Sequence, residues 1–324
     1  MLHFTSDAWD DEGERNLLPI LASLNDTLLL DDLDVLPSLN TVYELTDRTN
    51  LRFAYSRTLA RPTFRELAPY ESFLFVGDYT LRGNPSLKRT LIDNFDLRYE
   101  MYPREDANEL YSISVFYKRF TNAIEQSIIE EGSSLTRVIT YQNISPAQVL
   151  GVELEARKNL DFISHILKNV NAGANFTYLY SRARLPDQEY NRRVENVQAI
   201  GLSSDVVDRN RRLFGQPKYI ANAYMNYRSE DTKIDLSINF NMQGNFLSFV
   251  ELDTYTPNIF TYPRPSLDVN FNYKFLKNFT LQVLAVNLLN PDYALRYDFE
   301  QYDDIYYERY KVGRTFRLGV VYKL

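Results

Sequence analysis

The sequence predicts an all-β protein, an antiparallel meander of about eleven long strands that forms part of a transmembrane outer-membrane β-barrel. Apolar and polar residues alternate, most clearly from Leu267 to Phe275, which places the two kinds of side chain on opposite faces of a strand. Several of these runs reach about 10 to 13 residues, a length that suits a tilted strand crossing a bilayer. The connections between the runs alternate between short and long, as they do in outer-membrane barrels.

Composition is compatible with a barrel and excludes several other classes of protein. Aromatic residues make up 14% of the 324 residues, with 25 tyrosines and 20 phenylalanines. The net charge of −7 argues against a nucleic-acid partner, which would favour a basic face. The absence of cysteine excludes disulfides and thiolate chemistry. No apolar run reaches the roughly 18 residues that a transmembrane helix needs. Barrel strands contain no such run, because their lipid-facing apolar residues alternate with polar residues of the other face.

Residues 1–32 are acidic and differ from the rest of the chain. They include Asp10, Asp11, Glu12 and Glu14, and they show neither the basic start nor the apolar stretch of a signal peptide. Because an outer-membrane protein needs an export signal, we expect this sequence to be the C-terminal fragment of a longer product. We interpret residues 1–32 as an extracellular loop of a truncated barrel and residues 33–324 as barrel wall.

Taken in order, the alternating runs predict the strands of the meander. They lie at residues 36–45, 50–58, 91–102, 110–120, 137–158, 170–181, 219–227, 234–241, 267–275, 279–285 and 316–324. The run at 137–158 should bend at Pro146, because proline removes a donor from the ladder. The short connections are residues 46–49, 103–108, 160–168, 229–232 and 276–278. The long connections are predicted as loops at the opposite end and lie at residues 59–88, 121–135, 182–216, 246–262 and 290–312.

The alternation also assigns the two faces of the strands, and we expect residues 33–324 to form one contiguous curved sheet. The lipid-facing set is apolar and comprises Phe95, Leu97, Tyr99, Leu236, Ile238, Phe240, Leu267, Val269, Phe271, Leu318 and Val320. The set on the concave side is polar and comprises Asn94, Asp96, Arg98, Asp235, Asn239, Asp268, Asn270 and Asn272. A wet lumen or a plug requires polar residues there, so they do not by themselves indicate a ligand site.

Six segments, in order, resemble TonB-dependent outer-membrane receptors, particularly the Bacteroidota type. They are LRFAYSRTLARPTFRELAP at 51–69, GNPSLK at 83–88, SVFYKRFTN at 114–122, GVELE at 151–155, VNLLNPDY at 286–293 and GVVYKL at 319–324. The resemblance covers residues 33–324 and corresponds to the C-terminal half of the receptor barrel.

The resemblance implies a wall of about twenty-two strands that is filled by an N-terminal plug and imports a scarce nutrient with energy relayed by TonB. The nutrient would be a siderophore, cobalamin, a glycan or a peptide. Because this sequence contains neither a plug nor a TonB box, the TonB system is expected to act through a plug domain absent from this chain. A passive or adhesive outer-membrane barrel that binds ligands through its long loops is the alternative.

The last strand has two possible roles. In the resembled family the terminal strand is the signal for the barrel assembly machinery, which here would be Phe316, Leu318, Val320, Tyr322 and Leu324. The family usually ends on an aromatic residue, whereas this sequence ends on Leu324. The alternative is that these residues only make a lipid-facing strand with an apolar end.

Two groups of loop residues are candidates for binding a small nutrient. Tyr70, Phe73, Phe75 and Tyr79 can stack on sugar rings or a flat chelate, or they can pack the loop into a small core of its own. Arg192 and Arg193 belong to a group of arginines at 182–216 that can bind an anionic ligand or lipopolysaccharide phosphates. Acidic residues among these arginines favour internal ion pairs instead.

No catalytic, metal or cofactor site is expected. The two histidines are His3 and His165, and neither can be placed in a Ser-His-Asp arrangement at a plausible site. The acidic clusters at 31–34 and 303–304 lack the spacing of a calcium loop, so we interpret them as solvated. The sequence therefore predicts a transport protein rather than an enzyme, with outer-membrane lipid as its surroundings.

Overall fold

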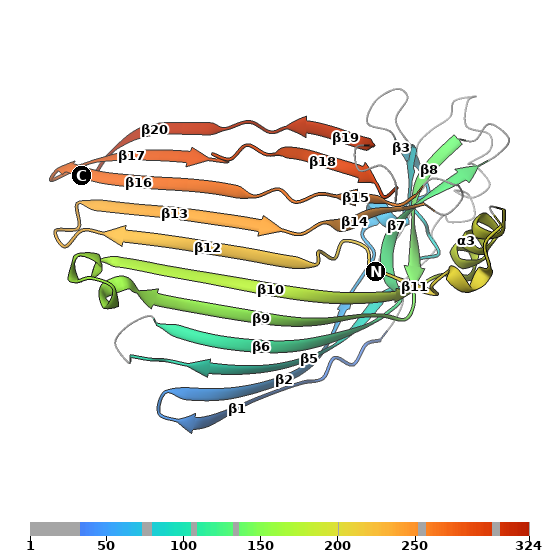
Figure 1. Ribbon diagram of the computed structural model, residues 1–324, viewed down its shortest axis with the longest axis horizontal. Helices are drawn as coiled ribbons and strands as arrows, with labels where there is room; N and C mark the ends of the chain where they lie inside the picture. Colours follow the sequence, from blue (N-terminus) through green and yellow to red (C-terminus); the bar gives the residue numbers. More distant parts are fainter. Residues whose placement is uncertain are drawn as a thin grey trace.

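The computed structural model describes residues 33–72, 80–104, 109–131, 136–199, 201–251, 257–299 and 305–323. Two β-sheets dominate this part of the chain (Figure 1). We call the larger one the main sheet and the smaller one the loop sheet. No helix among the described residues is long and apolar enough to cross a membrane.

The main sheet is an antiparallel meander in which each strand pairs with its neighbours along the chain. Its eleven strands, in spatial order, are β1 (Ser38–Thr46), β2 (Thr49–Ala60), β5 (Thr90–Met101), β6 (Leu110–Thr121), β9 (Ala147–Asn159), β10 (Val170–Arg184), β12 (Tyr219–Arg228), β13 (Ile234–Gln243), β16 (Ser266–Leu276), β17 (Phe279–Val286) and β20 (Thr315–Tyr322). A two-residue strand, β11 (Asn210–Arg211), pairs with β10. The predicted meander of about eleven long strands is confirmed.

Short connections gather at one end of the main sheet, which we call the turn end, and long connections gather at the other, the loop end (Figure 1). The turns are fixed locally. Thr232 has a φ of 55° between β12 and β13, and the Ser229 and Asp231 side chains close that turn with hydrogen bonds to Ile234 N and Lys233 N. Between β9 and β10 the chain makes two short 3₁₀ helices, η1 (Leu160–Phe162) and η2 (His165–Leu167), each begun by a side-chain cap.

The long connections fold into the loop sheet, so the expectation of one contiguous sheet over residues 33–324 was wrong. The eight strands of the loop sheet, in spatial order, are β19 (Tyr306–Lys311), β18 (Asp292–Tyr297), β15 (Ile259–Thr261), β14 (Phe246–Glu251), β7 (Ala123–Glu131), β8 (Thr136–Ile144), β4 (Thr80–Arg82) and β3 (Glu71–Ser72). Two of its pairings, β14 with β7 and β4 with β8, are parallel. The predicted loops at 121–135, 246–262 and 290–312 therefore contain strands that pair with one another.

The single strand predicted at residues 137–158 is also wrong. Ser145–Pro146, joined by a cis peptide bond, separates β8 of the loop sheet from β9 of the main sheet. Proline cannot donate to a ladder, so the strand ends here rather than bends. On the other side of β7, Asn122 at a φ of 58° turns the chain out of β6 into the loop sheet. Each junction is thus set by a residue with special backbone properties.

Two other long connections contain helices. The stretch at 182–216, predicted as irregular, holds α3 (Asp187–Ala199) and the 3₁₀ helix η3 (Ser204–Val206). The connection at 59–88 holds α2 (Phe64–Leu67), whose first turn is a capping box: Thr63 accepts from Glu66 N, and the Glu66 carboxylate accepts from Thr63 N.

A buried apolar cluster joins the two sheets. It combines Ala123 and Ile144 of the loop sheet with Val149 and Leu179 of the main sheet, and the partly buried Phe116 packs against it. The face of the main sheet that bears this cluster is called the inner face below. Residues one position along each strand lie on the outer face, where Phe95 is 40% and Leu97 is 48% exposed. Asn94 and Glu100, on the inner face, are buried.

Candidate functional site

The inner face of the main sheet carries a network of ion pairs across β2, β5 and β9. The Arg52 guanidinium donates to Glu100 at 2.6 Å, and Arg98 donates to Glu100 at 2.7 Å and to Glu155 at 2.8 Å. Glu155 also pairs with Arg157. Each carboxylate therefore serves two arginines, an arrangement that fixes the geometry of long side chains.

Hydrogen-bonded asparagines continue this network toward the C-terminal strands. Asn175 on β10, Asn222 on β12 and Asn241 on β13 lie in one register row. The Asn222 amide donates to Asn175 at 2.7 Å, and the Asn241 amide donates to Asn222 at 2.5 Å. The same row contains Glu100 and Glu155. The inner face thus presents a row of fixed polar groups across the sheet, as a water-filled or plug-lined pore requires.

A buried ion-pair network, which we call the loop-end lock, ties α3 to the loop sheet. The Arg211 guanidinium donates to Glu125 of β7 at 2.5 Å and to both carboxylate oxygens of Glu189 of α3, at 2.9 and 3.1 Å. The side chains of Arg211, Glu125 and Glu189 are 7%, 0% and 1% exposed. Gln142 of β8 donates a further hydrogen bond to Glu125 at 3.0 Å.

Burial and neighbouring charges shift the pKa values of the Glu125 and Arg211 side chains in opposite directions. Burial raises the pKa of the Glu125 carboxyl, although the Arg211 charge counteracts the effect. Burial alone would lower the pKa of Arg211, but the two carboxylates outweigh it and hold that pKa above its ordinary value. Arg211 therefore stays charged and is the centre on which the two glutamates depend.

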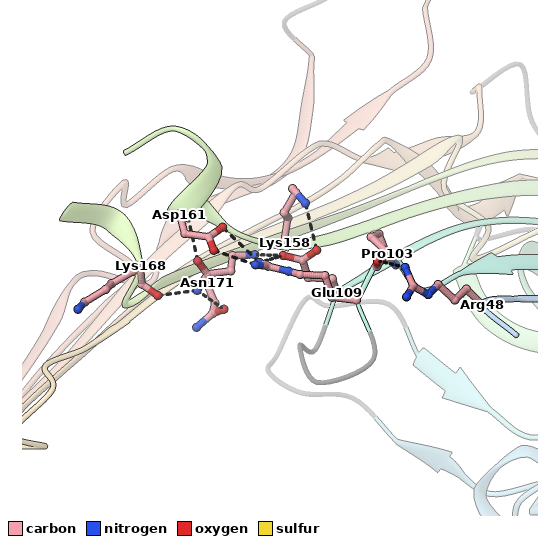
Figure 2. Close-up of polar contacts among 9 residues, drawn as sticks. Arg48, Pro103, Glu109, Lys158, Asp161, Lys168 and Asn171 are labelled. Carbon is pink, nitrogen blue, oxygen red and sulfur yellow. Dashed lines mark hydrogen bonds and ion pairs between the residues drawn. The ribbon is translucent and has the colours of Figure 1, made fainter. Parts of the chain in front are cut away.

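A second charged cluster closes the turn end (Figure 2). Arg104 donates to Asp161 at 2.8 Å and pairs with Glu109, which also accepts from Lys158 at 3.0 Å and from Asn159 N at 3.3 Å. Hydrogen bonding from Arg104 lowers the pKa of Glu109 and of Asp161. These contacts join the connection between β5 and β6 to that between β9 and β10, so they fix the relative position of two turns.

An open polar groove of about 910 Å³ lies beside this cluster. It is lined by Arg104, Arg157, Lys158, Asn159, Asp161, Lys168, Asn171, Ala172, Tyr224, Asn226, Tyr227, Arg228, Asp235 and Ser237. Among the described residues, no group of three or more histidines and acidic residues could hold a metal ion.

The candidate ligand residues fall into separate places. Tyr70 is 45% exposed and precedes β3, the edge strand of the loop sheet. Phe73, Phe75 and Tyr79 lie outside the described residues. Arg192 and Arg193 are neighbours on α3, and Arg193 donates to the buried Glu189 at 2.7 Å. Arg193 is thus part of the loop-end lock, as the acidic residues around it indicated.

The residues of the predicted assembly signal lie on the last strand of the main sheet. Phe316, Leu318, Val320 and Tyr322 are on β20, all at least 53% exposed, while Leu324 lies outside the described residues. β20 pairs with β17 alone among the described strands. The Tyr322 and Phe279 rings across that pairing are 4.8 Å apart.

Sequence reasoning missed Glu125 of the loop-end lock, whereas Glu189 is one of the acidic residues at 182–216 for which internal ion pairs were predicted. Arg211 was recognised as one of several arginines mixed with acidic residues at 182–216. That mixture of charges is the signal for internal pairing, but it does not point to Glu125, which lies 86 residues away in sequence.

Comparison with known proteins shows which family this chain resembles in sequence. The family model described as "TonB dependent receptor-like, beta-barrel" matches residues 7–288. The chain belongs to this family. Like other TonB-dependent receptor barrels, it is a protein of the Gram-negative outer membrane. The comparison with curated proteins gives no match.

Solved structures of such receptors share the fold of this chain. The ferric enterobactin receptor PfeA of Pseudomonas aeruginosa is similar at 19% identity with a TM-score of 0.54, over 89% of this chain and 40% of that one. The siderophore receptor PirA of Acinetobacter baumannii is similar at 17% identity with a TM-score of 0.54, over the same shares of the two chains. The copper transporter OprC is similar at 15% identity with a TM-score of 0.55, over 88% of this chain and 39% of that one. The chain thus spans about two fifths of the length of these structures.

Proposed function

We propose that this chain forms the C-terminal half of the barrel wall of a TonB-dependent receptor, over residues 33–324, and that the receptor imports a scarce nutrient. The observation that carries the proposal is the division of the chain into a meander and a loop sheet. The meander has an apolar outer face and a polar inner face, and the loop sheet gathers at one end of it. An apolar outer face, a polar inner face and long connections gathered at one end are typical of an outer-membrane barrel wall, and they support the proposal.

The proposal extends to the partners and to the ligand. TonB would act through a plug domain that these residues do not include, and the barrel assembly machinery would recognise β20. The nutrient would be a siderophore, cobalamin, a glycan or a peptide, bound at the loop end by residues that include Tyr70 and Arg192. The resemblance in sequence favours a receptor of the Bacteroidota type. We further propose that residues 1–32, which lie outside the described residues, belong to an extracellular loop.

Uptake by intact cells tests this function. Deleting the gene that encodes the chain should abolish high-affinity uptake of one of these nutrient classes, and deleting the TonB protein should have the same effect. Complementation with the intact gene is the control. Uptake that depends on this gene but continues without TonB would contradict the proposal and favour a passive barrel. Loss of cell adhesion with no change in uptake of any of the four classes would favour an adhesive one.

A further inference from the structure

The polar groove at the turn end opens on the inner face of the main sheet. Asn171 of β10 pairs in register with Asn226 of β12, which in turn pairs with Ser237 of β13, and all three line the groove. Asn171 lies an even number of positions from Leu179 of the inner-face cluster, so these side chains share the inner face. Short turns lie on the periplasmic side of outer-membrane barrels, so the groove is at the exit of the barrel. Its volume of about 910 Å³ suits a small-molecule site.

Charged side chains line part of the groove, but each is paired with an opposite charge. The pairs are Arg104 with Asp161, Arg157 with Glu155, Lys158 with Glu109, Lys168 with Glu230 and Arg228 with Asp235. In these pairs every cation meets a carboxylate. The groove therefore has no surplus charge, among its described lining residues, with which to select a charged ligand.

The ring of Tyr224 lies along the wall of the groove because the residue paired with it on β10 is a glycine. A Cβ atom at Gly173 would come within 2.5 to 2.6 Å of three atoms of the Tyr224 side chain. Only a residue without a side chain leaves room for this arrangement. The ring therefore leans onto β10 instead of standing out into the lumen, and it borders the groove. An aromatic ring held in this way is a platform on which the apolar face of a sugar ring stacks.

Neutral polar groups surround this platform. Asn226 lies two positions from Tyr224 on the same face of β12, and Asn239 of β13 pairs with Tyr224 in register. The side-chain amides of Asn226 and Asn239 and the hydroxyls of Ser237 and Tyr224 have no hydrogen-bond partner in the described part of the chain. An amide group both donates and accepts hydrogen bonds, as a sugar hydroxyl does, so the two are complementary.

We propose that this groove binds sugar units of a neutral glycan as the glycan leaves the barrel. The inference rests on the proposed function and narrows it to one of the four nutrient classes. Siderophore chelates, cobalamin and peptides usually carry charged groups, and the paired charges of the groove offer these no partner. A glycan presents ring faces to Tyr224 and hydroxyls to the amides and to Ser237. Weak, repeated contacts of this kind guide a solute without trapping it.

Photo-crosslinking tests the site on the protein extracted from outer membranes in mild detergent. The probes are linear tetrasaccharides of glucose in α and in β linkage, of mannose and of xylose, each with a diazirine at its reducing end. With at least one of them, the crosslinked peptides should include β12 (Tyr219–Arg228). Crosslinks that fall only on loop-end peptides, or on none, would overturn the proposal.

Variants of the groove then measure what each group contributes. Tyr224→Ala removes the platform and should weaken binding of the crosslinking tetrasaccharide about tenfold. Asn226→Ala removes an amide without a partner in the described part of the chain and should weaken binding about threefold, which keeps the test open if Tyr224→Ala does not fold. Tyr178→Ala, on the outer face of β10, is the matched control and should bind as the wild type does. Wild-type affinity in either groove variant would overturn the proposal.

Uptake by intact cells separates this inference from the proposed function. Tyr224→Ala cells should take up the glycan about tenfold more slowly than wild-type cells but bind it equally well at the cell surface, because the groove lies at the exit. An unchanged rate of uptake would overturn the inference. TonB-dependent uptake of a siderophore, cobalamin or a peptide, with no uptake of a glycan, would also overturn it and leave the proposed function standing. No TonB-dependent uptake of any of the four classes would overturn the proposed function itself.

Discussion

The main sheet and the loop sheet bury their apolar side chains in opposite ways. In the loop sheet, Ile128, Leu247, Val250 and Ile259 are at most 1% exposed and pack in clusters within the sheet region. In the main sheet the apolar residues of the outer face remain exposed, and Leu318 reaches 77%. The loop sheet therefore has the internal core of a protein folded in water, whereas the main sheet depends on lipid to cover it.

The two sheets also differ in how their strands pair. Every pairing in the main sheet is antiparallel and joins strands that follow one another in the meander. The loop sheet joins strands from four different connections, and two of its pairings are parallel. One chain can thus form a sheet that lipid covers and a second sheet that has its own core in water. Residues with special backbone properties, such as Asn122 and Pro146, lead the chain from one sheet into the other.

The largest expected effect concerns the edges of the main sheet, β1 and β20. Eleven antiparallel strands leave these two running in the same direction, so they cannot close the sheet by antiparallel pairing with each other. We expect residues 1–324, refolded alone into detergent or liposomes, to aggregate and to transport nothing, because unpaired backbone groups are costly in a bilayer. Heat-modifiable gel migration and solute leakage measure this. A monodisperse species with β1 hydrogen-bonded to β20 would contradict the expectation.

The next largest effect should come from Arg211, at the centre of the loop-end lock. Arg211→Ala leaves Glu125 and Glu189 buried without their cation, which should cost about 3–5 kcal/mol of local stability. Hydrogen exchange should accelerate in α3 and β7 and stay unchanged in β16 and β17. The control is Arg228→Ala, which breaks an exposed pair with Asp235 and should cost about 0–1 kcal/mol. Equal protection of α3 in the wild type and Arg211→Ala would show that the lock does not hold it.

A substitution on the outer face tests the other half of the comparison. Val269→Arg should destabilise the chain in lipid by about 2–4 kcal/mol if the residue is near the middle of the bilayer. Asn270→Arg, one position along β16 and on the inner face, is the matched control and should have little effect. Single spin labels at the same two positions measure the facing directly. Greater accessibility to lipid-dissolved oxygen at residue 270 than at residue 269 would mean that the faces are inverted.

The smallest expected effect is on acid stability at the turn end. The pKa of Glu109 is lowered in the folded chain, so its contribution to stability is complete above the ordinary carboxyl pKa, about 4.3, and is lost as the pH falls. Glu109→Gln should therefore reduce the melting temperature at pH 7 and flatten its decline below pH 5. Glu44→Gln, an exposed residue of β1 with no ion pair among the described residues, should leave the pH profile unchanged. An unchanged profile in Glu109→Gln would exclude this contribution.

The sequence determined the main sheet, because its signal is local. Alternation along a strand shows within one run of residues: the run predicted at 91–102 forms β5 (Thr90–Met101), and the one predicted at 110–120 forms β6 (Leu110–Thr121). The alternation of short and long connections then fixed the order and direction of the strands. The family resemblance rested on segments of the same chain, and it did not require knowledge of any long-range contact.

The tertiary structure decided the loop sheet and the sites at the loop end. Strands such as β15 (Ile259–Thr261) are too short to show a period, and β7 pairs with β14, which lies more than 100 residues further along the chain. The partner of Arg211 and, at the turn end, the contact of Tyr224 with Gly173 depend in the same way on contacts between distant segments. The residues next to a position in the sequence show whether it belongs to an alternating strand, but they do not show which strand it pairs with. These features therefore appear only once the chain is folded.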